Sequence, residues 1–355
     1  DSGVVISASH NPPEFNGIKF FNAHGRKWDD RWEALVERHF FDGAGGSSSR
    51  QKPGAVVDAG HLAEDYEDFL VGTLGGNPSF RGLRVGLDCS NGANSRTAPE
   101  LLRRLGAEII PIGIRPNGRN INVGCGSQHT AKLARVVKQN RCHLGIAFDG
   151  DGDRVILVDE KGGVVDGDHI IALLARAFKK QKRLKKNLAV ITVMANLGLK
   201  KALAQMGVKT VEVSVGDRYV SEAMRKTGAI LGGEQSGHII LGEFLPTGDG
   251  LLTALQMLAV VRDEHEPLSV LAGRMRKFPQ VLHNVPVAKK VPLAELDGVE
   301  ARIKRIEKTL GSNGRVLVRY SGTEPLLRIM LEGPDERALQ TYAGEIADCV
   351  RRAGR

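Results

Sequence analysis

The stretch HLGIAFDGDGDRVILVDEKGGVV, residues 143–165, contains the strongest signal in the sequence. It places two apolar runs, LGIAF and VILV, on either side of a short polar segment. Apolar runs of this length, bounded by glycine and aspartate, are typical of buried strands. We therefore expect two strands joined by an aspartate-rich loop.

The same alternation of apolar runs and amphipathic helical patterns continues outward from this loop. LRVGLDCSNGA precedes TAPELLRRLGA on one side, and LAVITV precedes LGLKKALAQMGV on the other. Strands that end in glycine or aspartate and lead into helices are typical of α/β chains with largely parallel sheets. After residue 276 the pattern changes to a helix, two strands and a helix, which predicts a small α+β domain.

Composition and pattern divide the 355 residues into four parts. The glycine- and serine-rich stretch 43–54 is a loop by composition, and a connecting helix follows it. The predicted domains are residues 1–70, 71–168, 169–276 and 277–355. We expect the first three to be related α/β units. The first shows only one clear strand, so we expect it to be incomplete.

Charge and cysteine content narrow the class of protein. The net charge is +9, but only 5% of residues are aromatic and no basic stripe is interleaved with them, which argues against binding of single-stranded nucleic acid. The 4 cysteines are widely spaced, so they predict neither a zinc site nor a disulfide framework. No apolar stretch approaches the length of a membrane span. We expect a cytoplasmic protein without nucleic-acid or membrane partners.

Three carboxylates alternate with glycines in FDGDGDR, residues 148–154. The glycines let the backbone turn tightly, so Asp149, Asp151 and Asp153 can converge as hard oxygen ligands for Mg²⁺ or Ca²⁺. An EF-hand is one alternative, but Arg154 stands where that loop requires glycine and the flanks look like strands. A turn with solvated carboxylates is the other alternative, and mutual repulsion argues against it.

The segment SASHNP, residues 7–12, follows an apolar run near the start of the chain. Ser9 could act as a nucleophile or carry a phosphoryl group, with His10 and Lys19 as proton-transfer or electrostatic partners. The local residues alone favour a stiff turn in which the serine is incidental.

Two later segments also carry polar side chains in turns. GEQSGH, residues 233–238, could bind sugar hydroxyls or form a polar hairpin. RYSGTEP, residues 319–325, could form an anion nest or a simple hairpin turn. VGDRYV, residues 215–220, is a weaker candidate for an anion nest or a hairpin turn.

SASHNP, DGDGDR, GEQSGH and RYSGTEP follow one another in the order found in the α-D-phosphohexomutase superfamily, which the chain resembles over essentially its whole length. The resemblance implies a phosphohexomutase-type fold: three related α/β domains and a small C-terminal α+β domain around a central cleft. Members that act on mannose or glucose phosphates typically differ in the last two loops. Gln235 and the RYSGT run therefore favour a glucosamine phosphate.

The resemblance also implies roles at the reacting end. Ser9 would carry the phosphoryl group. The implied catalytic residues are Ser9, His10, Lys19, Arg154 and His238. The implied ligands of one Mg²⁺ are the Ser9 phosphate, Asp149, Asp151 and Asp153. The implied substrate-binding residues are Glu234 and Ser236 for the sugar and Arg319, Ser321, Gly322, Thr323 and Arg328 for the phosphate that is not reacting.

As a whole, the resemblance implies an isomerase that interconverts glucosamine 6-phosphate and glucosamine 1-phosphate through phosphoserine and a sugar 1,6-bisphosphate, which is also the activator. The product would feed UDP-N-acetylglucosamine and cell-wall synthesis. The hexosamine phosphate would be the partner of a monomer or homodimer. Phosphomannomutase or phosphoglucomutase activity and a non-catalytic sugar-phosphate binder are the alternatives. Superfamily members carry more chain before the serine loop, so we expect an N-terminal truncation.

Overall fold

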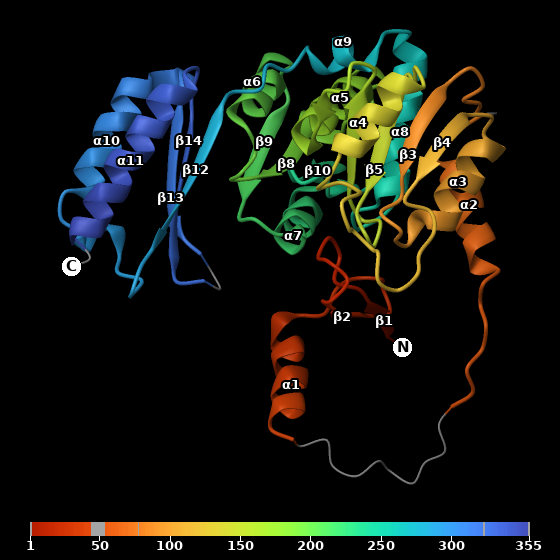
Figure 1. Cartoon of the computed structure of the whole chain (residues 1–355), viewed down its shortest axis with the longest axis horizontal. Helices are drawn as coiled ribbons and strands as arrows, with labels where there is room; N and C mark the ends of the chain where they lie inside the picture. The colour runs from red at the N-terminus through yellow and green to blue at the C-terminus, as the bar shows by residue number, and fades with distance from the viewer. Residues whose placement is uncertain (1, 44–53, 77, 322–323, 354–355) are drawn as a thin grey trace. The chain divides into compact units, whose positions relative to one another are not determined.

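The computed structural model describes residues 2–43, 54–76, 78–321 and 324–353. The chain divides into two compact units. The large unit comprises residues 1–194 and 206–274, and the small unit comprises residues 195–205 and 275–355. Figure 1 labels the elements along the chain. No helix in the described part is both long enough and apolar enough to span a membrane.

A five-stranded mixed sheet, in the order β4-β3-β5-β6-β7, forms one core of the large unit. β4, β3 and β5 are parallel, whereas β6 runs antiparallel to both β5 and β7. The strands are β3 Arg84–Asp88, β4 Glu108–Ile112, β5 Leu144–Phe148, β6 Val155–Asp159 and β7 Val164–Val165. The sheet is thus parallel over β4, β3 and β5, as expected of a largely parallel sheet. Strands β5 and β6 pair antiparallel, because the aspartate loop is too short for the crossover that parallel strands need.

Close packing against helices explains why this sheet is so apolar. Every residue of β5 and β6 is buried. Helix α4, Ala131–Gln139, packs directly on β5, and a Cβ at Gly145 would lie only 2.8 Å from a methyl group of Val137. Helices α2 Leu62–Gly72 and α3 Asn94–Arg104 also belong to this part of the chain. A strand buried on both faces reads as a continuous apolar run.

A second sheet of the large unit, in the order β11-β10-β8-β9, repeats the plan of three parallel strands and an antiparallel return. Its strands are β8 Leu188–Thr192, β9 Lys209–Val213, β10 Leu231–Gly233 and β11 Ile239–Leu241. The accompanying helices are α5 Gly167–Lys180, α7 Asp217–Thr227, α8 Gly250–Glu264 and α9 Leu268–Ala272. Helix α8 contacts β5, β6 and β11, so one apolar helix serves both sheets.

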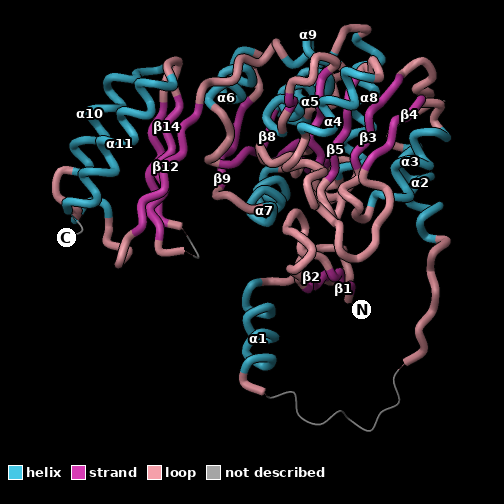
Figure 2. The backbone as a smooth tube through the Cα atoms, in the orientation of Figure 1, coloured by secondary structure: helices cyan, strands magenta, loops and turns pink. Residues whose placement is uncertain are grey.

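The N-terminal segment contrasts with these sheets. Strands β1 Gly3–Ile6 and β2 Ile18–Phe21 form a two-stranded antiparallel pair, and helix α1 spans Asp30–Phe41. Much of the described segment outside α1 is loop (Figure 2). None of the described residues before Leu70 is buried. This segment therefore contributes no core of its own within the described chain.

The small unit is an antiparallel sheet in the order β12-β14-β13 with two long helices. Its elements are α6 Leu197–Gln205, β12 Gln280–Pro286, α10 Val299–Leu310, β13 Arg315–Tyr320, β14 Leu326–Glu332 and α11 Glu336–Ala353. Apolar residues of α10, α11 and the sheet form its core. The sequence predicts a helix, two strands and a helix here, so it misses the third strand, β12. Most residues of this edge strand are partly or fully exposed and its last residue is proline, so its sequence pattern is weakly typical of a strand.

Candidate active site

The metal-binding loop joins the buried ends of β5 and β6. Asp149 is 1% exposed, and its Oδ1 accepts hydrogen bonds from the backbone N–H groups of Gly152 (3.1 Å) and Arg154 (3.2 Å). Gly152 has φ 79°, a left-handed conformation that favours glycine. The backbone thus folds around the first carboxylate. One oxygen from each of the three aspartates lies within 4.8 Å of the others.

The electrostatics of this loop fit a hard divalent cation. Burial, with the neighbouring charges of Asp153 and Asp151, raises the pKa of Asp149 to about 8. Burial opposes ionisation of Asp153 too, but its contact with His238 and nearby cations holds that pKa well below its usual range. The Oδ1 atoms of Asp151 and Asp153 are buried without hydrogen-bond partners. Oxygen ligands brought together in this way suit Mg²⁺. The EF-hand alternative is wrong, because strands flank the loop.

The serine loop lies directly on the metal loop. Ser9 Oγ donates a hydrogen bond to Asp149 Oδ2 at 2.9 Å. Ser9 has φ 53°, which is uncommon for a residue with a side chain. Its backbone is held on both sides, because its N–H donates to Ser7 Oγ (3.0 Å) and its carbonyl accepts from Asn122 Nδ2 (2.8 Å). A Cβ at Gly150 would lie 2.5 Å from that carbonyl, so glycine permits the approach.

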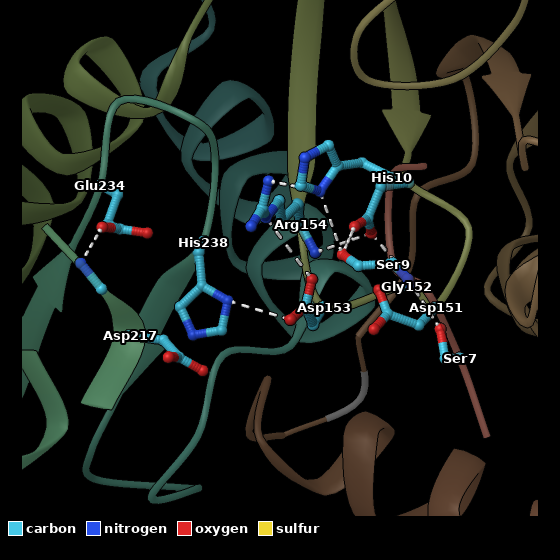
Figure 3. Close-up of polar contacts among 12 residues, drawn as sticks. Ser7, Ser9, His10, Asp151, Gly152, Asp153, Arg154, Asp217, Glu234 and His238 are labelled. Carbon is cyan, nitrogen blue, oxygen red and sulfur yellow. Dashed lines mark hydrogen bonds and ion pairs between the residues drawn. The ribbon is translucent and has the colours of Figure 1, made fainter. Parts of the chain in front are cut away.

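Two basic residues, His10 and Lys19, contact the metal loop, and Figure 3 shows the first of them beside Ser9 and Arg154. His10 Nδ1 lies 3.4 Å from Ser9 Oγ and accepts a hydrogen bond from Arg154 Nη1 at 3.1 Å. Burial and the charge of Arg154 lower the pKa of His10. Lys19, on β2, forms an ion pair with Asp151. Burial opposes its charge, but the carboxylates outweigh burial and raise the pKa of Lys19.

The loop GEQSGH, residues 233–238, joins β10 to β11 and is called the sugar-type loop below. It contacts the metal loop. A backbone bridge pairs Arg154 with His238, and His238 Nδ1 lies 3.2 Å from Asp153 Oδ2. Glu234 is 8% exposed, and its Oε1 accepts from the N–H of Gly216 at 2.9 Å. Ser236 is exposed on this loop. The large unit therefore brings together three of the four predicted motifs.

The fourth motif belongs to the small unit, where its described residues lie at the end of β13 and just before β14. Arg319 and Arg328 are paired across the two strands. Arg328 Nη2 donates to Glu324 Oε2 at 2.6 Å. Ser321 is 3% exposed, and its N–H donates to Leu326 O at 2.8 Å. Gly322 and Thr323 lie outside the described residues.

Some residues at the centre had no distinct signal in the sequence. Asn122 donates to the carbonyls of both Ser9 and Asn11 at 2.8 Å, although 113 positions separate it from Ser9. An asparagine in a loop gives no sign of so distant a partner. Asp217 comes from VGDRYV, which suggested only an anion-binding turn, and it lies beside His238 (Figure 3).

Comparison with known proteins defines the class to which this site belongs. Models of phosphoglucomutase/phosphomannomutase domains match four successive segments: the alpha/beta/alpha domains I, II and III match residues 1–45, 66–163 and 166–278, and the C-terminal domain matches residues 282–349. The chain therefore belongs to the phosphoglucomutase/phosphomannomutase family, within the phosphohexomutase superfamily.

Its curated relatives in that family are phosphoglucosamine mutases, which are isomerases. Those of Syntrophotalea carbinolica and Geobacillus kaustophilus are each 48% identical over 99% of this chain and 78% of their own length. The structure of Aspergillus fumigatus N-acetylphosphoglucosamine mutase, in complex with GlcNAc-6P and magnesium, has a TM-score of 0.77 at 19% identity and covers 100% of this chain and 89% of its own. Another structure of that enzyme contains glucose 1,6-bisphosphate.

Proposed function

We propose that the chain interconverts glucosamine 6-phosphate and glucosamine 1-phosphate, with Ser9 as the phosphoryl carrier and a sugar 1,6-bisphosphate as intermediate and activator. One observation carries the proposal. The Ser9 hydroxyl lies 2.9 Å from a carboxylate of a three-aspartate loop, inside a chain 48% identical to phosphoglucosamine mutases. A serine that carries phosphate at that position would add phosphate oxygens to the oxygen-rich metal site.

Positioning and charge neutralisation supply most of the rate in phosphoryl transfer. Mg²⁺ held by the three aspartates and the Ser9 phosphate would neutralise charge on the transferring group. The Lys19 ammonium, beside Asp151, adds a fixed positive charge at the same place. Since Arg154 donates to His10 Nδ1, a neutral His10 holds its proton on Nε2. His10 and His238 are the candidate groups for proton movement at the sugar hydroxyl.

The proposal also assigns residues that bind the substrate away from the reacting phosphate. Glu234 and Ser236 bind sugar hydroxyls. The phosphate that is not reacting binds the β13–β14 turn through Arg319, Ser321, Gly322, Thr323 and Arg328. We also propose the domain division 1–70, 71–168, 169–276 and 277–355, a cytoplasmic location, and a monomer or homodimer. A separate phosphate site lets the bisphosphate present either end to the serine.

The test is a mutase assay with Mg²⁺ and a trace of sugar 1,6-bisphosphate. Glucosamine 6-phosphate should be converted, and Ser9→Ala should abolish conversion because it removes the phosphoryl carrier. Ser7→Ala is the matched control, since it keeps Ser9 and removes only the hydrogen bond to its backbone. It should retain measurable activity. Conversion that survives Ser9→Ala would disprove the mechanism, and binding without conversion by the wild-type chain would favour the non-catalytic binder.

A further inference from the structure

A cavity of about 570 Å³ lies beside the sugar-type loop of the large unit. Its walls come from the segment after β2, from helix α7 and from the strands around β11. His238 lines it and also contacts Asp153 of the metal loop, so the cavity adjoins the reacting centre. The cavity and the reacting centre therefore share the His238 side chain.

The cavity carries charges of both signs, as expected of a site for a zwitterion. Its cationic lining residues are Arg26, Lys27, Lys185, Arg218 and Arg225. Its carboxylates are Asp29, Asp217 and Glu222. The side chain of Asp217 is 29% exposed, compared with 60% for Asp29 and 43% for Glu222. Asp217 is thus the best shielded anion in the cavity.

The local backbone fixes Asp217 next to the sugar-type loop. Gly216 has φ 135°, and its N–H donates to Glu234 Oε1 at 2.9 Å. This bond ties the turn that carries Asp217 to the loop that carries His238. Burial opposes ionisation of Asp217, but Lys27 and the charge of His238 outweigh it and hold the pKa of Asp217 below its ordinary value. Asp217 is therefore an anion at neutral pH.

Asp217 also retains capacity for another donor. Its Oδ1 accepts the N–H of Arg218 at 2.8 Å, and its Oδ2 pairs with Lys27. A carboxylate offers about four acceptor positions, so two are already used. A glucosamine phosphate differs from a glucose phosphate by an amino group at C2, which is largely protonated near neutral pH. Ammonium groups form their strongest hydrogen bonds with carboxylates.

We propose that the carboxylate of Asp217 binds the C2 ammonium of the hexosamine phosphate and so selects it over the corresponding glucose phosphate. The inference rests on the proposed function and adds a specificity determinant to it. Glu234 is the competing acceptor. However, Glu234 accepts from the Gly216 N–H and is assigned to hydroxyls that both sugars share.

The experiment compares kcat/KM for glucosamine 6-phosphate and glucose 6-phosphate in the full chain and in Asp217→Asn. Loss of one charge-assisted hydrogen bond should lower the value for glucosamine 6-phosphate about 10- to 100-fold and leave that for glucose 6-phosphate within about twofold. Glu222→Gln is the matched control, because it removes a more exposed carboxylate from the same helix and cavity. Its substrate preference should equal that of the wild type.

Equal losses for both sugars would overturn the proposal, because they would assign Asp217 a structural role with Lys27. An unchanged preference in Asp217→Asn together with a lost preference in Glu234→Gln would overturn it too. If Asp217→Asn fails to fold, as judged by circular dichroism, the same two kcat/KM values are measured for Asp217→Ser, with the same expected changes. Failure of the proposed function is distinguishable, since the wild-type chain itself would then not convert glucosamine 6-phosphate.

Discussion

Two loops meet at the contact between Ser9 and Asp149, and the chain supports them in opposite ways. The metal loop lies between β5 and β6, whose residues are all buried. The serine loop lies between β1 and β2, and every residue of β1 is exposed. Apolar packing therefore fixes one half of the reacting centre. The other half depends on a few polar contacts, made by Asn122, Lys19 and Arg154.

Because the two loops are supported differently, substitutions near each loop should affect different properties of the protein. Changes in the metal-loop sheet should act on the stability of the whole unit, because they remove buried apolar contacts. Changes in the contacts beneath the serine loop should act on turnover, because they alter where the phosphoryl group sits.

The largest effect is expected from Asp151→Asn in the metal loop. It removes the charge of a proposed metal ligand and the ion pair with Lys19, so kcat should fall about 10³-fold. Asp159→Asn, at the far end of β6, is the control. Asp159 Oδ1 accepts backbone N–H bonds from Lys161 and Gly163, and the amide oxygen of Asn can still accept both. The free energy of unfolding should therefore fall by no more than about 1 kcal/mol, and kcat should stay nearly unchanged. Equal kcat values for the two variants would contradict the assignment of the metal ligand.

Ile146→Ala tests the support of the metal loop. Ile146 is 0% exposed at the centre of β5, so truncation should lower the free energy of unfolding by about 3 kcal/mol. Urea unfolding followed by circular dichroism measures this change. A loss below about 1 kcal/mol would show that the sheet does not hold the loop as described.

Asn122→Ala tests the support of the serine loop. The variant loses hydrogen bonds to the carbonyls of Ser9 and Asn11, so kcat should fall about tenfold with little change in the melting temperature. Asn140→Ala is the control, since its side-chain amide donates to Val136 O at the end of helix α4. An unchanged kcat in Asn122→Ala would show that other contacts position Ser9.

The smallest effect is expected from Val5→Ala in β1. Val5 is 43% exposed, so the free energy of unfolding should change by no more than about 0.5 kcal/mol. The measurement is the same urea titration used for Ile146→Ala. A loss comparable to that of Ile146→Ala would erase the contrast between the two loops.

The sequence predicts the metal-loop side of this contrast well and the serine-loop side poorly. Two apolar runs on either side of alternating aspartates indicate β5, the metal loop and β6, because burial and ligand spacing both show in neighbouring residues of the sequence. The position of Ser9 depends on contacts with residues such as Asn122, 113 positions away, which no local pattern reveals. The local residues allow a phosphoryl carrier but favour a stiff turn, and the resemblance to a family reverses that preference. The edge strand β12 was missed for a related reason, since its packing comes from β14.

The most direct test of Ser9 as the phosphoryl carrier is the mass of the peptide containing Ser9 after incubation with Mg²⁺ and sugar 1,6-bisphosphate. We expect the mass of one added phosphoryl group on Ser9, and we expect it to be removed when excess glucosamine 6-phosphate is supplied. An unmodified Ser9 in a chain that still converts the substrate, or phosphate on another residue, would contradict that role.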